Sequence, residues 1–397
     1  MPTYISIGFS QAFNPEQAFN EAAVSLKHQL NQPVIDLVIA LITPSYARTE
    51  GLQLLRRILN PVRMIGSVTP AIIINERIES KGVALLGLTS SDIRFGMAAV
   101  DRVSLTSPRE TAFRVAHYAE SNLSVNQRYG SLFFLNSCSK NNSQISLGLQ
   151  DGLGHSFVIS GGIPCDQKLC DAPIIYNDKI LTDSFAGLVW GGETRAAIAA
   201  RHGWKVLGKP RMVTKAENNL IRTIDHQPAI TIYQNYFKND LSDPGSVNHL
   251  RLKELTNLYP IGVRTSDGKT FAPHHVVDAL ADGALVCQGE IPAGSCVHLM
   301  IGDKKTCRNA VRLAATELRD HLYNHTPQLV FVMESVSRRK LFGRERSTQT
   351  DIIKEILGLT VPVFGMYTYG EIAPLGQTKE LPDTQPQSTS IVLTAIG

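Results

Sequence analysis

Apolar residues along this chain recur with two alternating periods, one typical of amphipathic helices and one typical of strands. The alternation follows one order three times: helix, apolar strand, second helix, strand with glycine or proline, closing strand. The first unit is predicted at Pro15 to Leu30, 36–42, Thr49 to Leu59, 63–68 and 82–88. The second is predicted at Pro108 to Ser121, 131–136, Asn142 to Leu153, 157–162 and 185–190, and the third at Cys307 to Tyr323, 328–333, Thr348 to Leu357, 361–365 and 390–394.

This recurrence predicts an α/β fold built from repeated α/β modules. The strands are too hydrophobic to leave one sheet face in water, so the sheets are expected to stack against each other with helices outside. We therefore expect a layered α-β-β-α architecture with mixed sheets and two domains. An antiparallel hairpin is predicted over 284–300, turning at Ile291 to Gly294.

A polar stretch rich in Pro and Gly, 238–246, follows a predicted strand at 229–233. Such a stretch is typical of a domain boundary. We expect one domain at 1–237 and a second at 238–397, and clefts between domains are favoured places for small-ligand sites.

Composition narrows the class of protein. The 397 residues are 43% hydrophobic and 19% charged, and no tract is apolar enough to cross a bilayer. Met1 to Gly8 lacks the features of a signal peptide and is interpreted as a first strand, which predicts a cytoplasmic protein.

The net charge is +4, and most basic residues are scattered among acidic ones, so nucleic-acid binding is not indicated. Six cysteines indicate reduced thiols, and their spacing does not suit a paired-thiolate zinc site.

One segment, 337–346, carries five cations in ten residues. Two interpretations are open. It is either a solvated loop and helix start, or a surface for an acidic partner or an anionic ligand.

The sequence lacks the common motifs of hydrolases and nucleotide-binding enzymes. It has no G-x-S-x-G elbow, no P-loop and no G-x-G-x-x-G. Cys138 follows a predicted strand and is interpreted as a structural thiol rather than a nucleophile. We therefore expect a protein that is not an enzyme.

The segment 361–374 places glycines, two tyrosines and a carboxylate behind an apolar run. Gly365 and Gly370 would let the backbone approach another group closely. If the segment is extended, Tyr367, Tyr369 and Glu371 alternate onto one face as a line of hydrogen-bonding groups.

This segment resembles the end of the FIST domains (F-box and intracellular signal transduction), a family of sensory proteins. Further motifs fall in the family's order at 161–166, 228–233, 282–285, 291–295 and 388–394. The resemblance implies a FIST N domain, a FIST C domain and a sensory function. We place around a ligand pocket Tyr367, Tyr369, Glu371, Gly161, Gly162 and Asp166.

Some bacterial FIST proteins are haem-containing nitric oxide sensors that act on a histidine kinase or a cyclic-di-nucleotide signalling enzyme. The resemblance thus implies haem as a cofactor and such an enzyme as a partner. Of eleven histidines, the candidate ligands are the pair His274 and His275, and His298. Adjacent residues of a strand point to opposite sides, so only one of the pair can face a given pocket. His298 is predicted to share a strand face with Cys296 and Met300.

Three hypotheses follow for function. The first is a sensor, either of a diatomic gas through haem or of a small metabolite such as an amino acid, whose amine would suit Glu371. The second is a protein-docking module that uses the basic segment. The third is an enzyme built around Cys138 or Glu371. Because no output element is visible in the chain, a sensor must signal through a separate protein.

Overall fold

Three mixed sheets surround one hydrophobic core in the computed structural model, which describes residues 3–136, 141–164, 173–237, 249–265, 268, 270–343, 345, 348–374 and 384–397. The first sheet contains, in spatial order, β1 (Tyr4–Ser10), β6 (Val83–Thr89), β2 (Leu37–Ile42), β3 (Arg63–Val68), β10 (Ile174–Tyr176) and β11 (Lys179–Leu181). Its outer face is covered by α1 (Pro15–Leu30) and α2 (Thr49–Leu59). The short helix η1 (Pro44–Tyr46) follows β2.

The second and third sheets repeat this plan. The second contains β25 (Thr384–Gln387), β24 (Gly370–Pro374), β9 (Ile159–Ile163), β8 (Arg128–Phe134), β12 (Ser184–Gly192) and β7 (Ile93–Asp101), with η2 (Val103–Leu105), α3 (Pro108–Ser121) and α4 (Asn142–Leu153). The third contains β13 (Ala196–Arg201), β26 (Ile391–Ile396), β22 (Leu329–Ser335), β23 (Val363–Thr368), β4 (Ile72–Ile74) and β5 (Arg77–Glu79), with α7 (Lys304–His321), α8 (Val336–Phe342) and α9 (Thr348–Leu357).

Each module lends two strands to another module's sheet. The first module supplies β4 and β5 to the third sheet, the second supplies β10 and β11 to the first sheet, and the third supplies β24 and β25 to the second sheet. The exchange is cyclic, so the three modules form one body. At each exchange the chain leaves the end of β3, β9 or β23 near the contact between two sheets.

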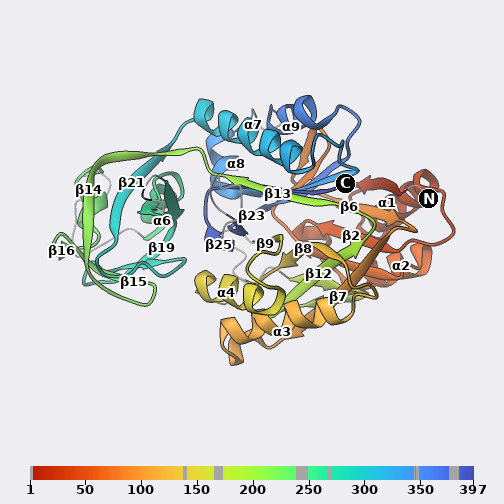
Figure 1. Ribbon diagram of the computed structural model, residues 1–397, viewed down its shortest axis with the longest axis horizontal. Helices are drawn as coiled ribbons and strands as arrows, with labels where there is room; N and C mark the ends of the chain where they lie inside the picture. The colour runs from red at the N-terminus through yellow and green to blue at the C-terminus, as the bar shows by residue number, and fades with distance from the viewer. Residues whose placement is uncertain are drawn as a thin grey trace.

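The predicted α/β class, mixed sheets and repeated modules are confirmed. Within each sheet the pairs β2 with β3, β8 with β9, and β22 with β23 are parallel, and the remaining pairs are antiparallel. One face of every sheet packs into the shared core, which includes Leu86, Leu132 and Phe331. The other faces pack under helices, so a path through the core crosses helix, sheet, sheet and helix (Figure 1).

Local sequence signals place the helix starts. Asn14 caps α1 by accepting a hydrogen bond from Gln17 N at 3.2 Å, and Ser107 caps α3 by accepting one from Glu110 N at 3.1 Å. Each of these caps precedes a proline at the first helical position. Asp303 caps α7 at 2.8 Å from Thr306 N.

The described residues between 204 and 302 form an additional unit, here called the insert, between β13 and α7. Its sheet has the order β18-β17-β21-β14-β15-β20-β19, and β16 also pairs with β15. The elements are β14 (Trp204–Glu217), β15 (Leu220–Ile224), β16 (Gln227–Pro228), α5 (Thr231–Gln234), α6 (His249–Leu258), β17 (Ile261–Arg264), β18 (Phe271–His274), β19 (Val276–Ala279), β20 (Leu285–Cys287) and β21 (Cys296–Gly302). The insert lies at one end of the molecule, beyond the three modules (Figure 1).

The hairpin predicted over 284–300 is wrong. β20 pairs with β15 and β19, whereas β21 pairs with β14 and β17. The reason is the length of β14, whose residues up to Met212 pair with β21 and whose residues from Val213 onward pair with β15. β14 and β15 therefore separate β20 from β21 in the sheet.

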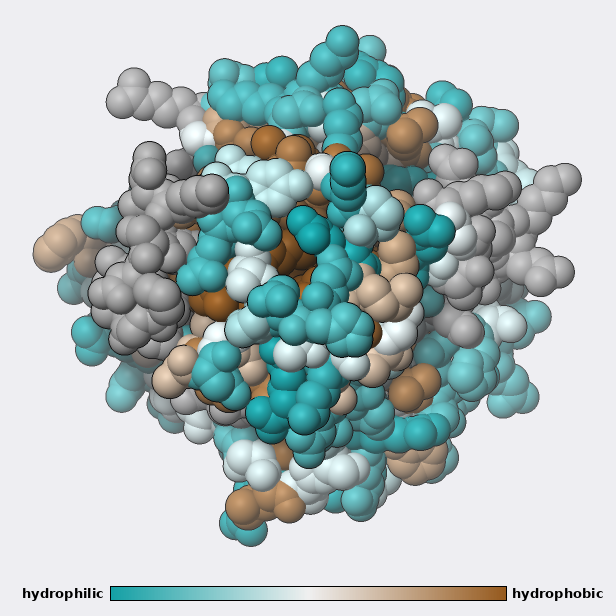
Figure 2. All heavy atoms as spheres, turned by 90° about the vertical axis from the view of Figure 1, so that its left-hand side faces the viewer, coloured by the Kyte–Doolittle hydropathy of each residue, from teal (hydrophilic) through white to brown (hydrophobic). Residues whose placement is uncertain are grey.

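The expected domain boundary at 238 lies outside the described residues. Strands from both sides of it share the insert sheet, because β14 and β15 precede residue 238 and β17 to β21 follow it. No helix among the described residues is both long and apolar enough to span a membrane. Figure 2 views the end formed by the insert, which is largely hydrophilic around a small hollow that exposes hydrophobic residues.

Candidate functional site

The repeated modules can be aligned by their parallel strand pairs. In each pair a glycine of the second strand lies opposite a residue of the first: Ala40 with Gly66, Phe133 with Gly161, and Val332 with Gly365. This register identifies equivalent positions in the three modules. At two of these equivalent positions the third module has an acidic residue, whereas the other two modules have apolar residues.

The first such residue is Glu334, two residues after Val332 in β22. The equivalent residues are Ile42 and Leu135, which are both fully buried beneath helices. Glu334 is also buried, with 1% of its surface exposed. An acidic side chain therefore occupies a core position.

The second is Glu371 in β24, opposite Gly162 of β9. The equivalent residues of the other exchanged strands are Ile72, opposite Met366, and Ile174, opposite Ser67. Both isoleucines belong to the shared core, and Glu371 is fully buried as well. Burial of a carboxylate costs free energy unless partners compensate its charge. Hydrophobic packing alone therefore does not explain why a glutamate stands at this position.

The charge of Glu334 is compensated by Arg338, which lies four residues later in α8. Arg338 Nε donates to Glu334 Oε1 at 3.0 Å, and both side chains are almost completely buried. Burial raises the pKa of Glu334, while Arg338, Tyr367 and Gln349 act in the opposite direction. Removal of one partner from a buried ion pair of this kind leaves the other as an unpaired buried charge, which is strongly destabilising.

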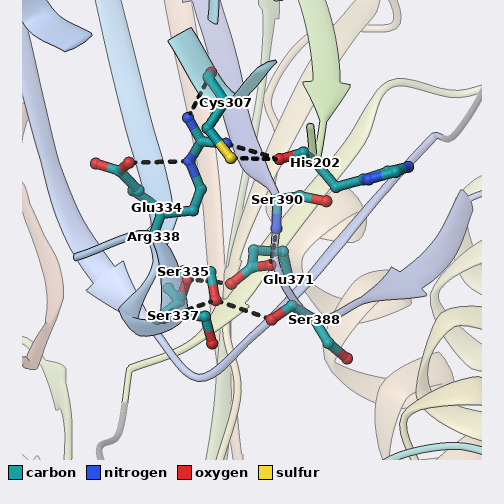
Figure 3. Close-up of polar contacts among 10 residues, drawn as sticks. His202, Cys307, Glu334, Ser335, Ser337, Arg338, Glu371, Ser388 and Ser390 are labelled. Atoms are coloured by element: carbon teal, nitrogen blue, oxygen red, sulfur yellow. Dashed lines mark hydrogen bonds and ion pairs between the residues drawn. The ribbon is translucent and has the colours of Figure 1, made fainter. Parts of the chain in front are cut away.

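The other guanidinium nitrogens of Arg338 bind main-chain oxygens of distant segments. One donates to His202 O at 2.8 Å and the other to Cys307 O at 3.0 Å (Figure 3). The His202 ring is neutral at physiological pH, because burial lowers its pKa to about 4. Arg338 thus joins three segments through one planar group.

Within the part of the chain that the structure describes, Glu371 accepts hydrogen bonds from two neutral groups. Its Oε1 accepts from the Thr368 hydroxyl at 2.6 Å. Its Oε2 accepts from the main-chain N–H of Ser390 at 3.1 Å (Figure 3). Burial raises the pKa of Glu371 to about 8, against the lowering effect of these hydrogen bonds and of Arg338. The carboxyl group is therefore mainly protonated at neutral pH. Strongly raised carboxyl pKa values concentrate at functional sites.

Serines and residues of the insert close the site from one side. Ser335 Oγ donates to Ser388 O at 2.8 Å, and Ser337 Oγ lies 3.0 Å from His275 Nε2. Gln288 accepts from Ser388 Oγ at 3.0 Å and donates to Tyr369 O at 3.1 Å. His275 and Gln288 belong to the insert, so the insert covers the polar site of the third module.

Tyr367, Tyr369 and Glu371 do not share one strand face, and that prediction is wrong. Tyr367 lies in β23 of the third sheet, and Glu371 lies in β24 of the second sheet. The chain passes between the sheets at Tyr369, whose N–H donates to Ile163 O at 2.8 Å. The Tyr369 ring lies beside His275, with ring centroids 5.7 Å apart, and Tyr367 packs beneath helices.

The predicted pair Gly161 and Gly162 does lie beside Glu371. Gly162 is directly opposite Glu371, and Gly161 is opposite Ile372. A Cβ on Gly162 would lie 2.7 Å from Thr368 Cγ2 and 2.8 Å from Met333 Sδ, so a side chain there would displace Thr368. Asp166 lies outside the described residues, as do Cys138, Cys165 and Cys170.

The three candidate iron ligands do not converge. His274 is opposite Ile261, whereas His298 is opposite the next residue, Gly262, so these two imidazoles lie on opposite faces of the insert sheet. His298 packs edge-on against Phe271, with ring centroids 4.9 Å apart. Within the described residues no three His, Cys, Asp or Glu side chains form a group that could hold a metal ion.

These surroundings do not fit haem. A haem needs an apolar slot beside its ligand. His275 instead lies among Ser337, Gln288 and Tyr369, and burial lowers its pKa to about 3. The apolar cavity at the centre of the three sheets, lined by Leu86, Leu132 and Phe331 among others, has a volume of ≈ 20 Å³, room for about one water.

The basic segment 337–346 is not a wholly solvated helix start. Arg338 is fully buried because its guanidinium meets Glu334 and two main-chain oxygens. Arg339 donates to Pro70 O at 3.2 Å and to Ser80 Oγ at 2.8 Å, which links α8 to the first module. Arg344 and Arg346 lie outside the described residues.

Several residues of the site escaped the sequence analysis, notably Glu334, Ser337 and Gln288. One signal was available for Glu334. Alignment of the three predicted units places an acid where Ile42 and Leu135 end the corresponding apolar strands. No comparable signal exists for Gln288, which reaches the site only through the fold of the insert.

Comparison with known proteins identifies the family. The FIST N domain matches residues 36–227 and the FIST C domain matches residues 229–374. No curated protein matches the sequence.

Two solved structures of cyanuric acid hydrolase resemble the whole fold remotely. One, from A. caulinodans, has 8% identity, 99% coverage of both chains and a TM-score of 0.37. The other, described as an evolutionary innovation by structural concatenation, has 8% identity, 100% coverage of both chains and a TM-score of 0.38. The two domain matches together span most of the chain, which therefore belongs to the FIST family, whose domains generally serve as sensory domains in signal transduction.

Proposed function

We propose that this protein is a sensor that binds a small ligand with a protonated nitrogen beside Glu371, leaves it chemically unchanged, and signals to a separate protein. The observation that carries the proposal is the burial of Glu371 at a position where two equivalent strands have Ile72 and Ile174. A core isoleucine would be the simpler choice for stability. A buried carboxyl group with a raised pKa at this position instead suits a binding site.

The charge of the site favours a cationic ligand. Arg338 is already paired with Glu334, and Glu371 is bonded to the neutral groups Thr368 Oγ and Ser390 N–H. A protonated amine beside Glu371 would stabilise the carboxylate and lower its pKa. Binding at neutral pH then releases a proton from Glu371. The amine of an amino acid meets this requirement, as does any small primary amine.

Binding is coupled to conformation because the site is covered. His275 and Gln288 of the insert contact Ser337 and Ser388 of the third module. A ligand that reaches Glu371 must displace part of this cover, and it therefore binds one arrangement of the insert more tightly than another. Such a difference in affinity is what a sensor requires.

Haem and nitric oxide are the other ligands that the family resemblance suggests. The polar surroundings of His275 and the opposite orientation of His274 and His298 favour the amine-bearing ligand. Purified protein supplied with haem tests the choice. A Soret band that shifts with nitric oxide and weakens in His275→Ala or His274→Ala would replace the amine proposal.

The amine proposal is tested by thermal shift and calorimetry. Methylammonium and a panel of L-amino acids should raise the melting temperature of the wild type, whereas their N-acetylated counterparts should not. Glu371→Ile, which installs the residue of the sister modules, should remove the shift. Calorimetry in two buffers of different ionisation enthalpy should report release of a proton at pH 7. A panel without any thermal shift in the wild type contradicts the proposal.

The signalling partner is proposed from the family. A histidine kinase or a cyclic-di-nucleotide enzyme is the expected receiver, because some bacterial proteins that resemble this one act on such enzymes. Autophosphorylation or cyclic-di-nucleotide synthesis by a kinase or cyclase encoded beside this protein should change when the protein is added. The change should differ with and without the amine, and Glu371→Ile should abolish that difference.

An enzymatic alternative has one observation in its favour, the 3.0 Å approach of Ser337 Oγ to His275 Nε2. A neutral imidazole at that distance could accept a serine proton. Both side chains are fully buried, which favours a structural hydrogen bond in the closed state. Hydrolysis of a bound amide or ester that is lost in both Ser337→Ala and His275→Ala would establish the alternative.

A further inference from the structure

Two neighbouring segments of the chain connect the insert to the body. The chain enters it through His202 and Gly203, and leaves it through Asp303 at the start of α7. The two connections touch, because a Cβ on Gly203 would lie 2.8 Å from Cys307 Cα. The φ of Gly203 is +84°, a conformation that glycine adopts without strain.

Arg338 holds both connections. It donates to His202 O in the first connection and to Cys307 O in the first turn of α7, while Glu334 fixes the guanidinium to the end of β22. Figure 3 shows this side chain between the two connections. A planar group with several N–H donors can bind three acceptors in fixed directions, which a lysine ammonium cannot reproduce.

The same short helix, α8, contacts both the ligand site and the insert. Ser337 in α8 bonds to His275 of the insert, and Phe342 packs with Trp204 and Met300 of the insert. Trp204 is anchored further, since its Nε1 donates to Leu258 O at 3.0 Å. Movement of α8 would therefore change the position of the insert.

We propose that Arg338 sets the orientation of the insert and relays occupancy of the Glu371 site to it, which makes the insert the signalling arm. The relay rests on the proposed function, whereas the control of orientation does not. Arg338 acts to lower the pKa of both Glu371 and Glu334, against the raising effect of burial, so the guanidinium interacts with both carboxyl groups. When a bound cation keeps Glu371 ionised, the electric field at the Arg338 guanidinium changes. That change alters the relative strength of its hydrogen bonds to Glu334 and to the carbonyl oxygens of His202 and Cys307.

Distance measurement between spin labels in the full chain tests the proposal. Ketone-bearing unnatural residues are placed at Lys215 of the insert and Leu105 of the body, both exposed, so the native cysteines remain. The variants are Arg338→Lys, and Arg338→Met combined with Glu334→Gln, which removes the buried charge together with its partner. Arg339→Lys is the matched control, because Arg339 is the next residue of α8 and donates to Pro70 and Ser80 of the first module.

Without ligand, we expect one narrow distance distribution in the wild type and the control, and broadened distributions in both Arg338 variants with retained circular dichroism. Unchanged distributions in both variants would overturn the proposal. With methylammonium, the wild-type distribution should shift and that of Arg338→Lys should not, although its melting temperature still rises. An equal shift in both proteins overturns the relay.

The two proposals fail differently. If methylammonium neither stabilises nor shifts the wild type, the proposed function fails and the relay fails with it. The control of orientation is then decided by the distributions without ligand.

Discussion

Glu371 of β24 lies directly opposite Gly162 of β9, although the two residues come from different modules. The pairing is possible because the third module lends β24 to the second sheet. The absence of a side chain on Gly162 leaves room for Thr368, which donates to Glu371 Oε1 at 2.6 Å. The hydrogen bond to the Glu371 carboxyl group therefore depends on the glycine at position 162.

Gly162→Ala should destabilise the protein more than Gly161→Ala. The new methyl group at 162 would lie 2.7 Å from Thr368 Cγ2 and 2.8 Å from Met333 Sδ, whereas at 161 the nearest atom is 3.3 Å away. Overpacking of this kind costs about 1–3 kcal/mol. Urea denaturation of both variants measures the difference. Equal losses would show that the space beside Glu371 is not needed.

Glu371 should make stability depend on pH. Burial raises the pKa of Glu371 to about 8 from an ordinary value of 4.5, so the folded state holds a proton that the unfolded state releases. Its contribution is greatest below pH 4.5 and is lost as the pH rises towards 8, at up to about 1.4 kcal/mol per pH unit. Glu371→Gln removes this dependence, so the variant should gain stability relative to wild type between pH 5.5 and 8.5 in chemical denaturation. A constant difference between the two proteins over that range contradicts the assignment.

The ion pair of Arg338 and Glu334 should show strong coupling. Arg338→Met alone leaves a buried carboxylate without its counter-ion and should cost about 3–5 kcal/mol of unfolding free energy. Addition of Glu334→Gln should recover part of that loss, because the unpaired charge is removed. A double-mutant cycle measures the coupling, and additive effects of the two substitutions would contradict it.

The described cysteines should differ in reactivity. Burial raises the pKa of Cys287 to about 12 and that of Cys307 to about 11, and both thiols are buried. Cys296 is partly exposed. Because the thiolate is the reactive form, iodoacetamide at pH 8 should modify Cys296 before the other two. Peptide mass spectrometry on native protein checks the order, and early modification of Cys307 would show that the connections of the insert open readily.

The modules were predictable because their signals are local. The apolar run at 328–333 corresponds to β22 (Leu329–Ser335), and the helix predicted at Pro15 to Leu30 has those bounds in the structure. The family motifs also predicted that Gly161, Gly162 and Glu371 lie around one site, and in the structure Gly162 is opposite Glu371. The face expected for Tyr367 and Glu371 was wrong, since the change of sheet at Tyr369 depends on pairing with Ile163 rather than on the period of the segment.

The sequence alone determined the order of helices and strands, the repetition of the modules and the family, because periodicity and motifs involve residues a few positions apart. Only the tertiary structure decided which sheet each exchanged pair of strands joins, and which charges are buried. Arg338 shows the reason. Its sequence neighbours indicate a basic surface, but its burial depends on Glu334 and on the carbonyl of His202, 136 residues away. Such contacts are set by the packing of whole modules, which no local pattern encodes.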